Sequence, residues 1–249
     1  LHLLSRRQRQ MCIRDRANII ENHDQPRGAS LFIPEEDYGF YSLSALATII
    51  FCERGLPFLY QGQEIGMSNR QWKYDEFNDL ETINQYQIAL KAGMSKEQAL
   101  EIARHHSRDN ARTPMQWSSE ENAGFSKGKP WMPVNENYKV VNVAEEEKEY
   151  GSILNFYKRL IAFYKSEEYN EILTYGDFRP IYEKEDHIFA YSRSYGCQKL
   201  VLICNFSSKE KDIELSEDYE NVVFVNYEQT TVIGNTLKMK PYECVIYEM

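Results

Sequence analysis

The spacing of hydrophobic residues changes once along the chain. Before about residue 170 these residues recur at helical spacing, as in the segment 152–165, where Ile153, Phe156 and Leu160 lie along one stripe. After residue 170 hydrophobic and polar residues alternate with a period of two. The pattern therefore predicts a first part that contains helices and a second part built only of strands.

The first part contains two short strand candidates as well as helices. Ala17–Glu21 is one candidate, and Pro57–Tyr60 is wholly apolar, as in a parallel sheet that is buried on both faces. Helices are predicted at Tyr38–Arg54, Asp79–Lys91, Ser95–His106 and Ser152–Lys165. Two strands do not complete an α/β domain. We therefore expect residues 17–169 to be the C-terminal part of a truncated α/β domain.

The second part, residues 170–249, is divided into short strands by turns at Gly196, Gly234 and Pro241. The predicted strands are Phe178–Tyr182, Ile188–Ser194, Leu200–Phe206, Lys211–Leu215, Val222–Asn226, Thr236–Met239 and Glu243–Tyr247. Short strands with turns at such spacing are typical of an antiparallel β-sandwich. We predict a C-terminal β-sandwich domain.

Residues 1–16 differ in composition from the rest of the chain. Their sequence, LHLLSRRQRQMCIRDR, has five arginines and one acidic residue, whereas the whole chain has a net charge of −9. Such a segment is compatible with a transit peptide. However, the chain starts at Leu and runs directly into a strand candidate. We therefore interpret residues 1–16 as a sequencing or assembly artefact, and expect the natural protein to have begun upstream.

Charge and composition exclude several classes of function. The sequence pI of about 5.2 argues against a nucleic-acid partner, because phosphates are bound by basic surfaces. No run of about 18 apolar residues is present, so we expect no membrane span. The five cysteines are scattered and show no zinc-site spacing. We therefore expect no cofactor or metal, and a reducing, cytoplasmic location.

Six sequence motifs occur in an order that resembles a known family. They are NHDQPR (22–27), YQGQEIGM (60–67), NDLETIN (78–84), SRDNARTPMQW (107–117), NAGFSKGKPWMPVNENY (122–138) and SILNFYKRLIAFYK (152–165). In this order they resemble the C-terminal half of family 13 glycoside hydrolases, the α-amylase superfamily, and within it the oligo-1,6-glucosidase and α-glucosidase branch. The resemblance implies strands seven and eight of a (β/α)8 TIM barrel, the last barrel helices and a C-terminal β domain.

The resemblance also implies a function for the parent protein. It implies a retaining α-glucosidase that releases terminal α-linked glucose from a small oligosaccharide substrate. The nucleophile and the acid/base would lie in the missing N-terminal half of the same barrel, so the chain alone is expected to be inactive. Two alternatives stay open: an enzyme similar to trehalose-6-phosphate hydrolase, and a non-catalytic binding or transporter-associated module of the same fold.

The motif NHDQPR carries the first candidate site residues, His23 and Asp24. Retaining glycosidases use two carboxyl groups, a nucleophile and an acid/base. By resemblance Asp24 is neither, but a third carboxylate that holds the 2- and 3-hydroxyls of the sugar and stabilises the cationic transition state, while His23 donates a hydrogen bond to a neighbouring hydroxyl. A fixed carboxylate near developing positive charge gains most in the transition state. The ordinary alternative is that Asp24 caps an Asx-type turn.

Arginines provide the remaining candidates. Arg108 and Arg112 are four residues apart, so a helical segment would place both on one face, where guanidinium groups bind carboxylates or sugar hydroxyls. The resemblance favours Arg112 as the glucose contact, with Arg108 as support. A surface ion-pair cluster is the alternative. Arg27 is expected either to frame the leaving-group side of the substrate or to form an ordinary salt bridge. Glu64 and Asp79 are expected to hold loops.

Overall fold

The computed structural model describes residues 17–216 and 221–249, which form two compact units. The first unit contains the described residues up to Ile19, together with Gly39–Phe58 and Phe156–Met249. The second contains Ile20–Tyr38 and Leu59–Asn155. The predicted origin of residues 1–16 concerns a segment outside the described ranges. The domain boundaries at residues 16/17 and 169/170 stay predictions.

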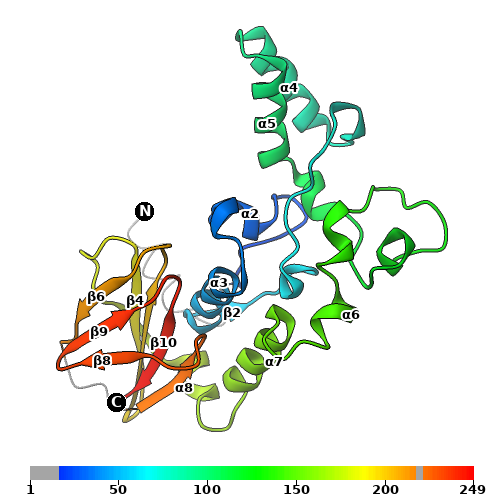
Figure 1. Cartoon of the computed structure of the whole chain (residues 1–249). Helices are drawn as coiled ribbons and strands as arrows, with labels where there is room; N and C mark the ends of the chain where they lie inside the picture. Colours follow the sequence, from blue (N-terminus) through cyan, green and yellow to red (C-terminus); the bar gives the residue numbers. More distant parts are fainter. Residues whose placement is uncertain (1–16, 217–220) are drawn as a thin grey trace, which may run out of the picture. The chain divides into compact units, whose positions relative to one another are not determined.

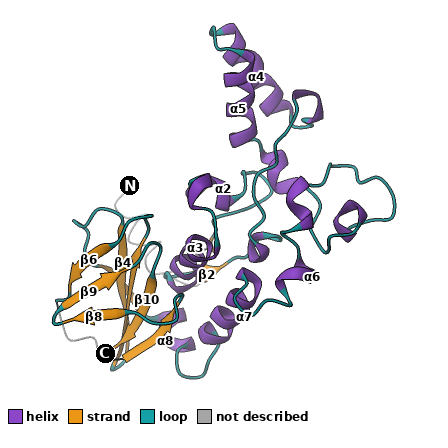
Figure 2. Cartoon of the chain, in the orientation of Figure 1, coloured by secondary structure: helices purple, strands orange, loops and turns teal. Residues whose placement is uncertain are grey.

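Helices occur in both units (Figures 1 and 2). They are α2 (Gly28–Phe32), α3 (Phe40–Cys52), α4 (Leu80–Lys91), α5 (Lys96–His106), α6 (Val143–Glu146), α7 (Ile153–Tyr164) and α8 (Asn170–Tyr175). Short 3-10 helices are η2 (Glu35–Asp37), η3 (Gln63–Ile65), η4 (Tyr74–Glu76), η5 (Arg108–Arg112), η6 (Glu121–Gly124) and η7 (Glu136–Lys139). Within the described residues, no helix has the length and apolar character needed to cross a membrane.

The strands within residues 17–216 and 221–249 all belong to the first unit (Figure 2). They are β1 (Ala17–Asn18), β2 (Leu56–Pro57), β3 (Asp177–Pro180), β4 (Ile188–Tyr195), β5 (Gln198–Asn205), β6 (Lys211–Glu214), β7 (Asn221–Val225), β8 (Thr231–Ile233), β9 (Thr236–Met239) and β10 (Cys244–Glu248). β8 was not predicted, because two of its three side chains are exposed and give no alternation of buried and exposed positions.

Strands β1 and β2 form a parallel pair joined through helix α3. Ala17 lies opposite Leu56, and Asn18 lies opposite Pro57. The side-chain amide of Asn18 donates a hydrogen bond of 3.2 Å to the carbonyl of Glu53, just beyond the last residue of α3. Strand β1 is shorter than predicted, and β2 shares only Pro57 with the predicted strand, whereas α3 lies within the predicted helix. A parallel strand pair with an intervening helix is the repeating unit of a β/α barrel.

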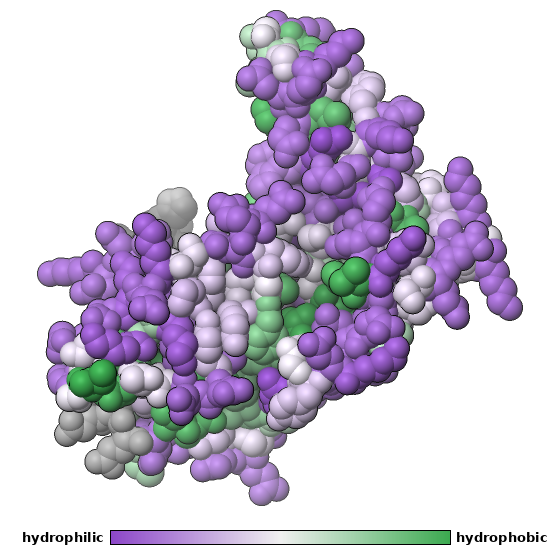
Figure 3. Space-filling view, in the orientation of Figure 1, coloured by the Kyte–Doolittle hydropathy of each residue, from purple (hydrophilic) through white to green (hydrophobic). Residues whose placement is uncertain are grey.

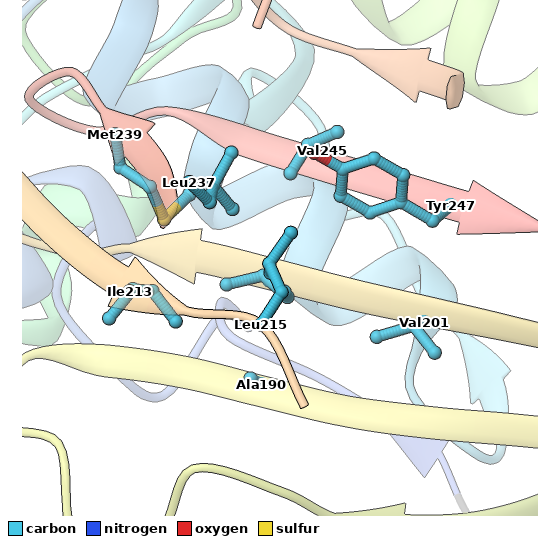
Figure 4. Close-up of a cluster of buried hydrophobic side chains, with 9 residues drawn as sticks. Ala190, Val201, Ile213, Leu215, Leu237, Met239, Val245 and Tyr247 are labelled. Carbon is cyan, nitrogen blue, oxygen red and sulfur yellow. The ribbon is translucent and has the colours of Figure 1, made fainter. Parts of the chain in front are cut away.

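The β part of the first unit is an antiparallel sandwich, as predicted. One sheet has the strand order β3-β4-β5-β10-β7 and the other has the order β6-β9-β8. Their inner faces enclose a buried cluster of side chains from both sheets, among them Val201, Ile213, Leu237 and Val245 (Figure 4). Alternate residues of each strand therefore supply the core, which is the pattern that the period of two predicts.

Helix α8 corrects the predicted start of β structure at residue 170. Tyr169, Ile172 and Leu173 are buried at positions i, i+3 and i+4, which is helical spacing. The helix is anchored by a buried arginine, since Arg193 donates hydrogen bonds of 2.8 Å to the carbonyl of Leu173 and 2.7 Å to that of Cys52. Residues 170–175 thus continue the helical part of the chain.

In the second unit, α4 and α5 lie side by side as a helical hairpin (Figure 1). Their surface is mainly hydrophilic (Figure 3), so the contact between them depends on the inner faces, where Tyr86, Ala99 and Ala103 are buried. The predicted capping box opens α5: Ser95 Oγ accepts from the Gln98 amide, and Gln98 Oε1 accepts from the Ser95 amide. This hairpin supplies one wall of the candidate site.

Candidate functional site

The turn that contains His23 and Asp24 is closed by the residue before them. Asn22 Oδ1 accepts a hydrogen bond of 2.8 Å from the Asp24 amide, and the Asn22 carbonyl accepts one of 3.4 Å from the Gln25 amide. The Asx-type cap of this turn is therefore Asn22, not Asp24. The carboxylate of Asp24 is left free to bind other side chains.

Three side chains meet at the Asp24 carboxylate. His23 Nε2 lies 3.1 Å from Oδ2, Arg112 Nη2 lies 3.0 Å from Oδ1, and Arg108 Nη1 lies 3.5 Å from Oδ1. Arg112 also donates from Nε to the His23 carbonyl at 3.0 Å. The side chains of His23 and Asp24 are 72% and 54% exposed. The structure thus brings four of the five predicted site residues into one cluster that is open to solvent.

Helix η5 determines how the two arginines reach Asp24. Ser107 caps it, because Ser107 Oγ accepts from the Asp109 amide at 3.2 Å. Asp109 is buried and accepts from the Asp79 amide at 2.9 Å, which fixes η5 against the start of α4. Arg108 and Arg112 are less buried and bind the same carboxylate. The expected shared orientation is confirmed, although the helix is of the 3-10 type.

Asp79 is a buried carboxylate that holds Arg108. Its Oδ1 accepts from Arg108 Nε at 2.9 Å and from Nη2 at 2.8 Å, while Oδ2 accepts from the Thr82 hydroxyl at 2.7 Å. Burial opposes ionisation, but the hydrogen bonds from Arg108 and Thr82 and the charge of Arg108 outweigh it and lower the pKa of Asp79. Asp79 also caps α4, so the expectation that it holds a loop is confirmed.

Arg27 lies outside this cluster. Its side chain is fully buried, with Nη1 3.2 Å from Glu21 Oε2 and 2.7 Å from the Gln61 carbonyl. Burial raises the pKa of Glu21, and the charge of Arg27 opposes that rise. A Cβ at Gly62, whose φ is +90°, would lie 3.0 Å from Arg27 Nη1. Arg27 therefore forms the buried salt bridge that was the second of its two expected roles.

A pocket of about 310 Å³ opens beside Asp24, and sequence reasoning missed it. Its walls come from α4 and α5 and include Glu81, Gln85, Tyr86 and His106. No local signal predicts this pocket, because it exists only through the packing of two helices against each other. Among the described residues, no group of three or more His, Cys, Asp or Glu side chains is arranged to hold a metal ion.

Comparison with known proteins shows the family. Residues 2–176 match the family described as "Alpha amylase, catalytic domain", and residues 188–246 match the "Alpha-amylase SusG C-terminal domain". The chain belongs to the α-amylase family of glycoside hydrolases. The predicted fold class, part of a TIM barrel followed by an antiparallel β domain, is thereby confirmed for this α-amylase family member.

The proteins similar to this α-amylase family chain include, by name, an oligo-1,6-glucosidase, a trehalose-6-phosphate hydrolase and an isomaltulose synthase. The oligo-1,6-glucosidase of Bacillus cereus is 40% identical over 234 residues, which is 92% of this chain and 41% of that protein. The crystal structure of Bacillus licheniformis trehalose-6-phosphate hydrolase has a TM-score of 0.86 at 37% identity, with 93% of this chain and 42% of that chain covered. The crystal structure of the isomaltulose synthase of Protaminobacter rubrum has a TM-score of 0.84 at 34% identity, with 93% of this chain and 42% of that chain covered. The chain thus spans about 41% of the length of its first curated relatives.

Proposed function

We propose that the protein to which this chain belongs is a retaining α-glucosidase of the oligo-1,6-glucosidase kind, which releases terminal α-linked glucose from short oligosaccharides. The observation that carries the proposal is the state of the Asp24 carboxylate. It is half-exposed, has no part in capping its own turn, and is held by His23, Arg108 and Arg112. A carboxylate fixed in this way can bind sugar hydroxyls without first being reoriented.

Each residue of the cluster has a role in this proposal. Glycoside hydrolysis passes through an oxocarbenium-like transition state, in which positive charge develops on the sugar ring. Asp24 would bind the 2- and 3-hydroxyls and stabilise that charge. His23 would donate a hydrogen bond to an adjacent hydroxyl. Arg112 would hold the non-reacting part of the glucose, and Arg108 would fix the position of the Asp24 carboxylate.

Two alternatives are less well supported. A non-catalytic module gains nothing from an exposed sugar-binding carboxylate flanked by arginines, so the Asp24 cluster favours an enzyme. An enzyme that acts on trehalose 6-phosphate needs cationic groups that bind phosphate, and Arg108 is already engaged by the carboxylates of Asp79 and Asp24. The cysteines that the structure describes, at positions 52, 197, 204 and 244, are free thiols, which supports a reducing and therefore cytoplasmic location.

We also propose that the 249-residue chain alone is inactive, because Asp24 would be neither the nucleophile nor the acid/base. The purified chain is expected to bind isomaltose, as measured by saturation-transfer NMR, yet to release no glucose from isomaltose, maltose or a nitrophenyl α-glucoside. The Asp24→Asn variant should weaken this binding by no more than about tenfold, because the amide can still hydrogen-bond the sugar hydroxyls. The matched control Asp75→Asn removes an exposed carboxylate elsewhere in the same unit and should keep it. Binding as tight in Asp24→Asn as in the unmodified chain would contradict the proposed contact of Asp24 with the sugar hydroxyls.

A further inference from the structure

Among the described residues, three buried thiols lie at the outer face of the five-stranded sheet. Cys204 and Cys244 are directly opposite each other on the paired strands β5 and β10. Their neighbours Ile203 and Val245 belong to the sandwich core, so both cysteines point to the other side of the sheet, against which helix α3 packs. Cys52, the last residue of α3, is the third thiol, and it is near enough to influence the ionisation of Cys244.

The backbone pairing brings the Cys204 and Cys244 side chains close together. The amide of Asn205 donates a hydrogen bond of 2.9 Å to the carbonyl of Glu243, so these neighbours form a hydrogen-bonded pair of the ladder. In an antiparallel ladder such pairs alternate with non-hydrogen-bonded pairs, whose Cα atoms are about 4.5 Å apart and whose side chains are closer. Cys204 and Cys244 therefore form a non-hydrogen-bonded pair, and their thiols share a hydrogen bond. A disulfide needs Cα atoms about 4.4–6.8 Å apart, so this pair can be bridged without moving the backbone.

The segment between the two cysteines contains the whole of the smaller sheet. Residues 205–243 include β6, β8 and β9, which make up that sheet, and also β7, which pairs with β10. A bond between Cys204 and Cys244 would enclose these four strands in one covalent loop. Closing a long loop stabilises a fold because it reduces the conformational freedom of the unfolded chain.

We infer that Cys204 and Cys244 are a site of reversible oxidation, at which hydrogen peroxide converts the two thiols into a cross-strand disulfide that locks the sandwich. First, one thiol loses its proton and its sulfur attacks a peroxide oxygen, so that the O–O bond breaks and a sulfenic acid and water form. The second thiol then attacks the sulfenic sulfur. The S–S bond forms, and the hydroxyl leaves with the proton of the second thiol as water. The two sulfurs are oxidised and the peroxide is reduced.

Burial makes this oxidation slow and dependent on conditions. Burial raises the pKa of the Cys244 thiol, as does its hydrogen bond with Cys204, and burial also raises the pKa of Cys52 to about 12. Because the thiolate is the reactive form, these groups react only when the sheet opens locally. The pair therefore stays reduced in a reducing compartment and closes under sustained exposure to peroxide. Cys197, in the turn between β4 and β5, is exposed and reacts separately.

The test uses the 249-residue chain with Cys12→Ser and Cys197→Ser, which leaves the three buried cysteines. The folded chain is treated with hydrogen peroxide, the remaining thiols are alkylated, and the unreduced peptides are mapped by mass spectrometry. We expect a link between Cys204 and Cys244, with a mass about 2 Da below that of the two thiol peptides together. The melting temperature should rise by about 10 °C on oxidation and return when dithiothreitol reduces the bond.

Two alanine variants in this background locate the bond. Cys204→Ala should abolish both the link and the rise in melting temperature. Cys52→Ala is the matched control, because it removes the buried thiol of α3, and it should leave both effects in place. If either variant fails to fold, the peptide map of the background chain decides, since it identifies the linked residues directly. A link that joins Cys52 to either strand, or folded chain that forms no link, overturns the inference. A Cys204–Cys244 link that leaves the melting temperature unchanged overturns the locking of the sandwich.

Discussion

Arg112 Nη2 lies 3.0 Å from Asp24 Oδ1, although the two residues are 88 positions apart in the sequence. The same guanidinium also donates from Nε to the His23 carbonyl, so it fixes both the backbone and the side chain of the turn. The orientation of the Asp24 carboxylate therefore depends on η5 as much as on its own turn. Changes at Asp24 and at Arg112 should have different kinetic effects.

Asp24→Asn should affect the chemical step. The experiment uses a chimera in which this chain replaces the matching segment of the Bacillus cereus oligo-1,6-glucosidase. The substitution keeps the size of the side chain but removes its charge. Loss of one group that stabilises transition-state charge commonly costs about 10²–10³-fold in kcat. Because the effect arises mainly in the transition state, kcat on isomaltose should fall far more than KM rises.

The control for this measurement is Asp75→Asn in the same chimera, which should leave kcat within twofold because the side chain is exposed and does not line the pocket beside Asp24. The product of the Asp24→Asn variant should keep the anomeric configuration of the substrate, since the nucleophile is unchanged. A kcat that changes by less than about threefold would show that Asp24 makes no contact specific to the transition state.

Arg112→Ala should act mainly on substrate binding. If Arg112 holds the non-reacting part of the glucose, it does so in both the ground state and the transition state, and its loss raises KM. We expect a rise of about tenfold, which corresponds to about 1.4 kcal/mol. Arg112→Lys keeps the charge but loses the second hydrogen bond, so it should restore only part of the affinity. A fall in kcat with unchanged KM would assign Arg112 to the transition state instead.

Local sequence signals predicted much of this architecture. The Ser95–Gln98 capping box gave the start of α5 within one residue, and alternation gave β4, β5 and β10. Helix α8 was missed because its six residues directly precede the strands, although Tyr169, Ile172 and Leu173 have helical spacing. A short helix that stands where the hydrophobic spacing changes from helical to alternating is easily assigned to the strands that follow it.

The sequence predicted four residues of the candidate site but not how they are held together. Motifs indicated His23, Asp24, Arg108 and Arg112, but the contact of Arg108 with Asp79 joins residues 29 positions apart. The pocket depends on how α4 packs against α5. Both features arise from tertiary packing. The spacing of residues along α4 or α5 does not predict how the two helices pack.

Arg193→Met should destabilise the first unit. The buried guanidinium of Arg193 donates to the carbonyls of Cys52 and Leu173 at 2.7 and 2.8 Å, close to the C-terminal ends of α3 and α8. A cation is favourable there, and its removal leaves buried carbonyls without donors. The expected loss of unfolding free energy is about 3 kcal/mol, measured by urea unfolding of the chain. The exposed Arg179 lies in the same sheet, and Arg179→Met should change stability by less than about 0.5 kcal/mol.

The last prediction concerns the pH dependence of stability at Asp79. Hydrogen bonds from Arg108 and Thr82, together with the charge of Arg108, outweigh the effect of burial and lower the pKa of Asp79 in the folded chain. A lowered carboxylate pKa means that the stabilisation is fully present above the unfolded pKa of about 3.9 and is lost as the pH falls through the folded value.

The Asp79→Asn variant isolates this contribution. At pH 7 it should lower the free energy of unfolding by about 2 kcal/mol, because a buried charge-assisted hydrogen bond to Arg108 is lost and the cap of α4 is weakened. The difference between the variant and the unmodified chain should shrink as the pH falls below about 4, because Asp79 is protonated first in the unfolded chain and only at lower pH in the folded chain. Urea unfolding at pH 7, 5 and 3 measures it, and the exposed Asp75→Asn control should show little difference at any of these pH values. If the difference for Asp79→Asn stays constant from pH 7 to pH 3, the carboxylate contributes through shape rather than charge, and the ion pair with Arg108 does not stabilise the fold.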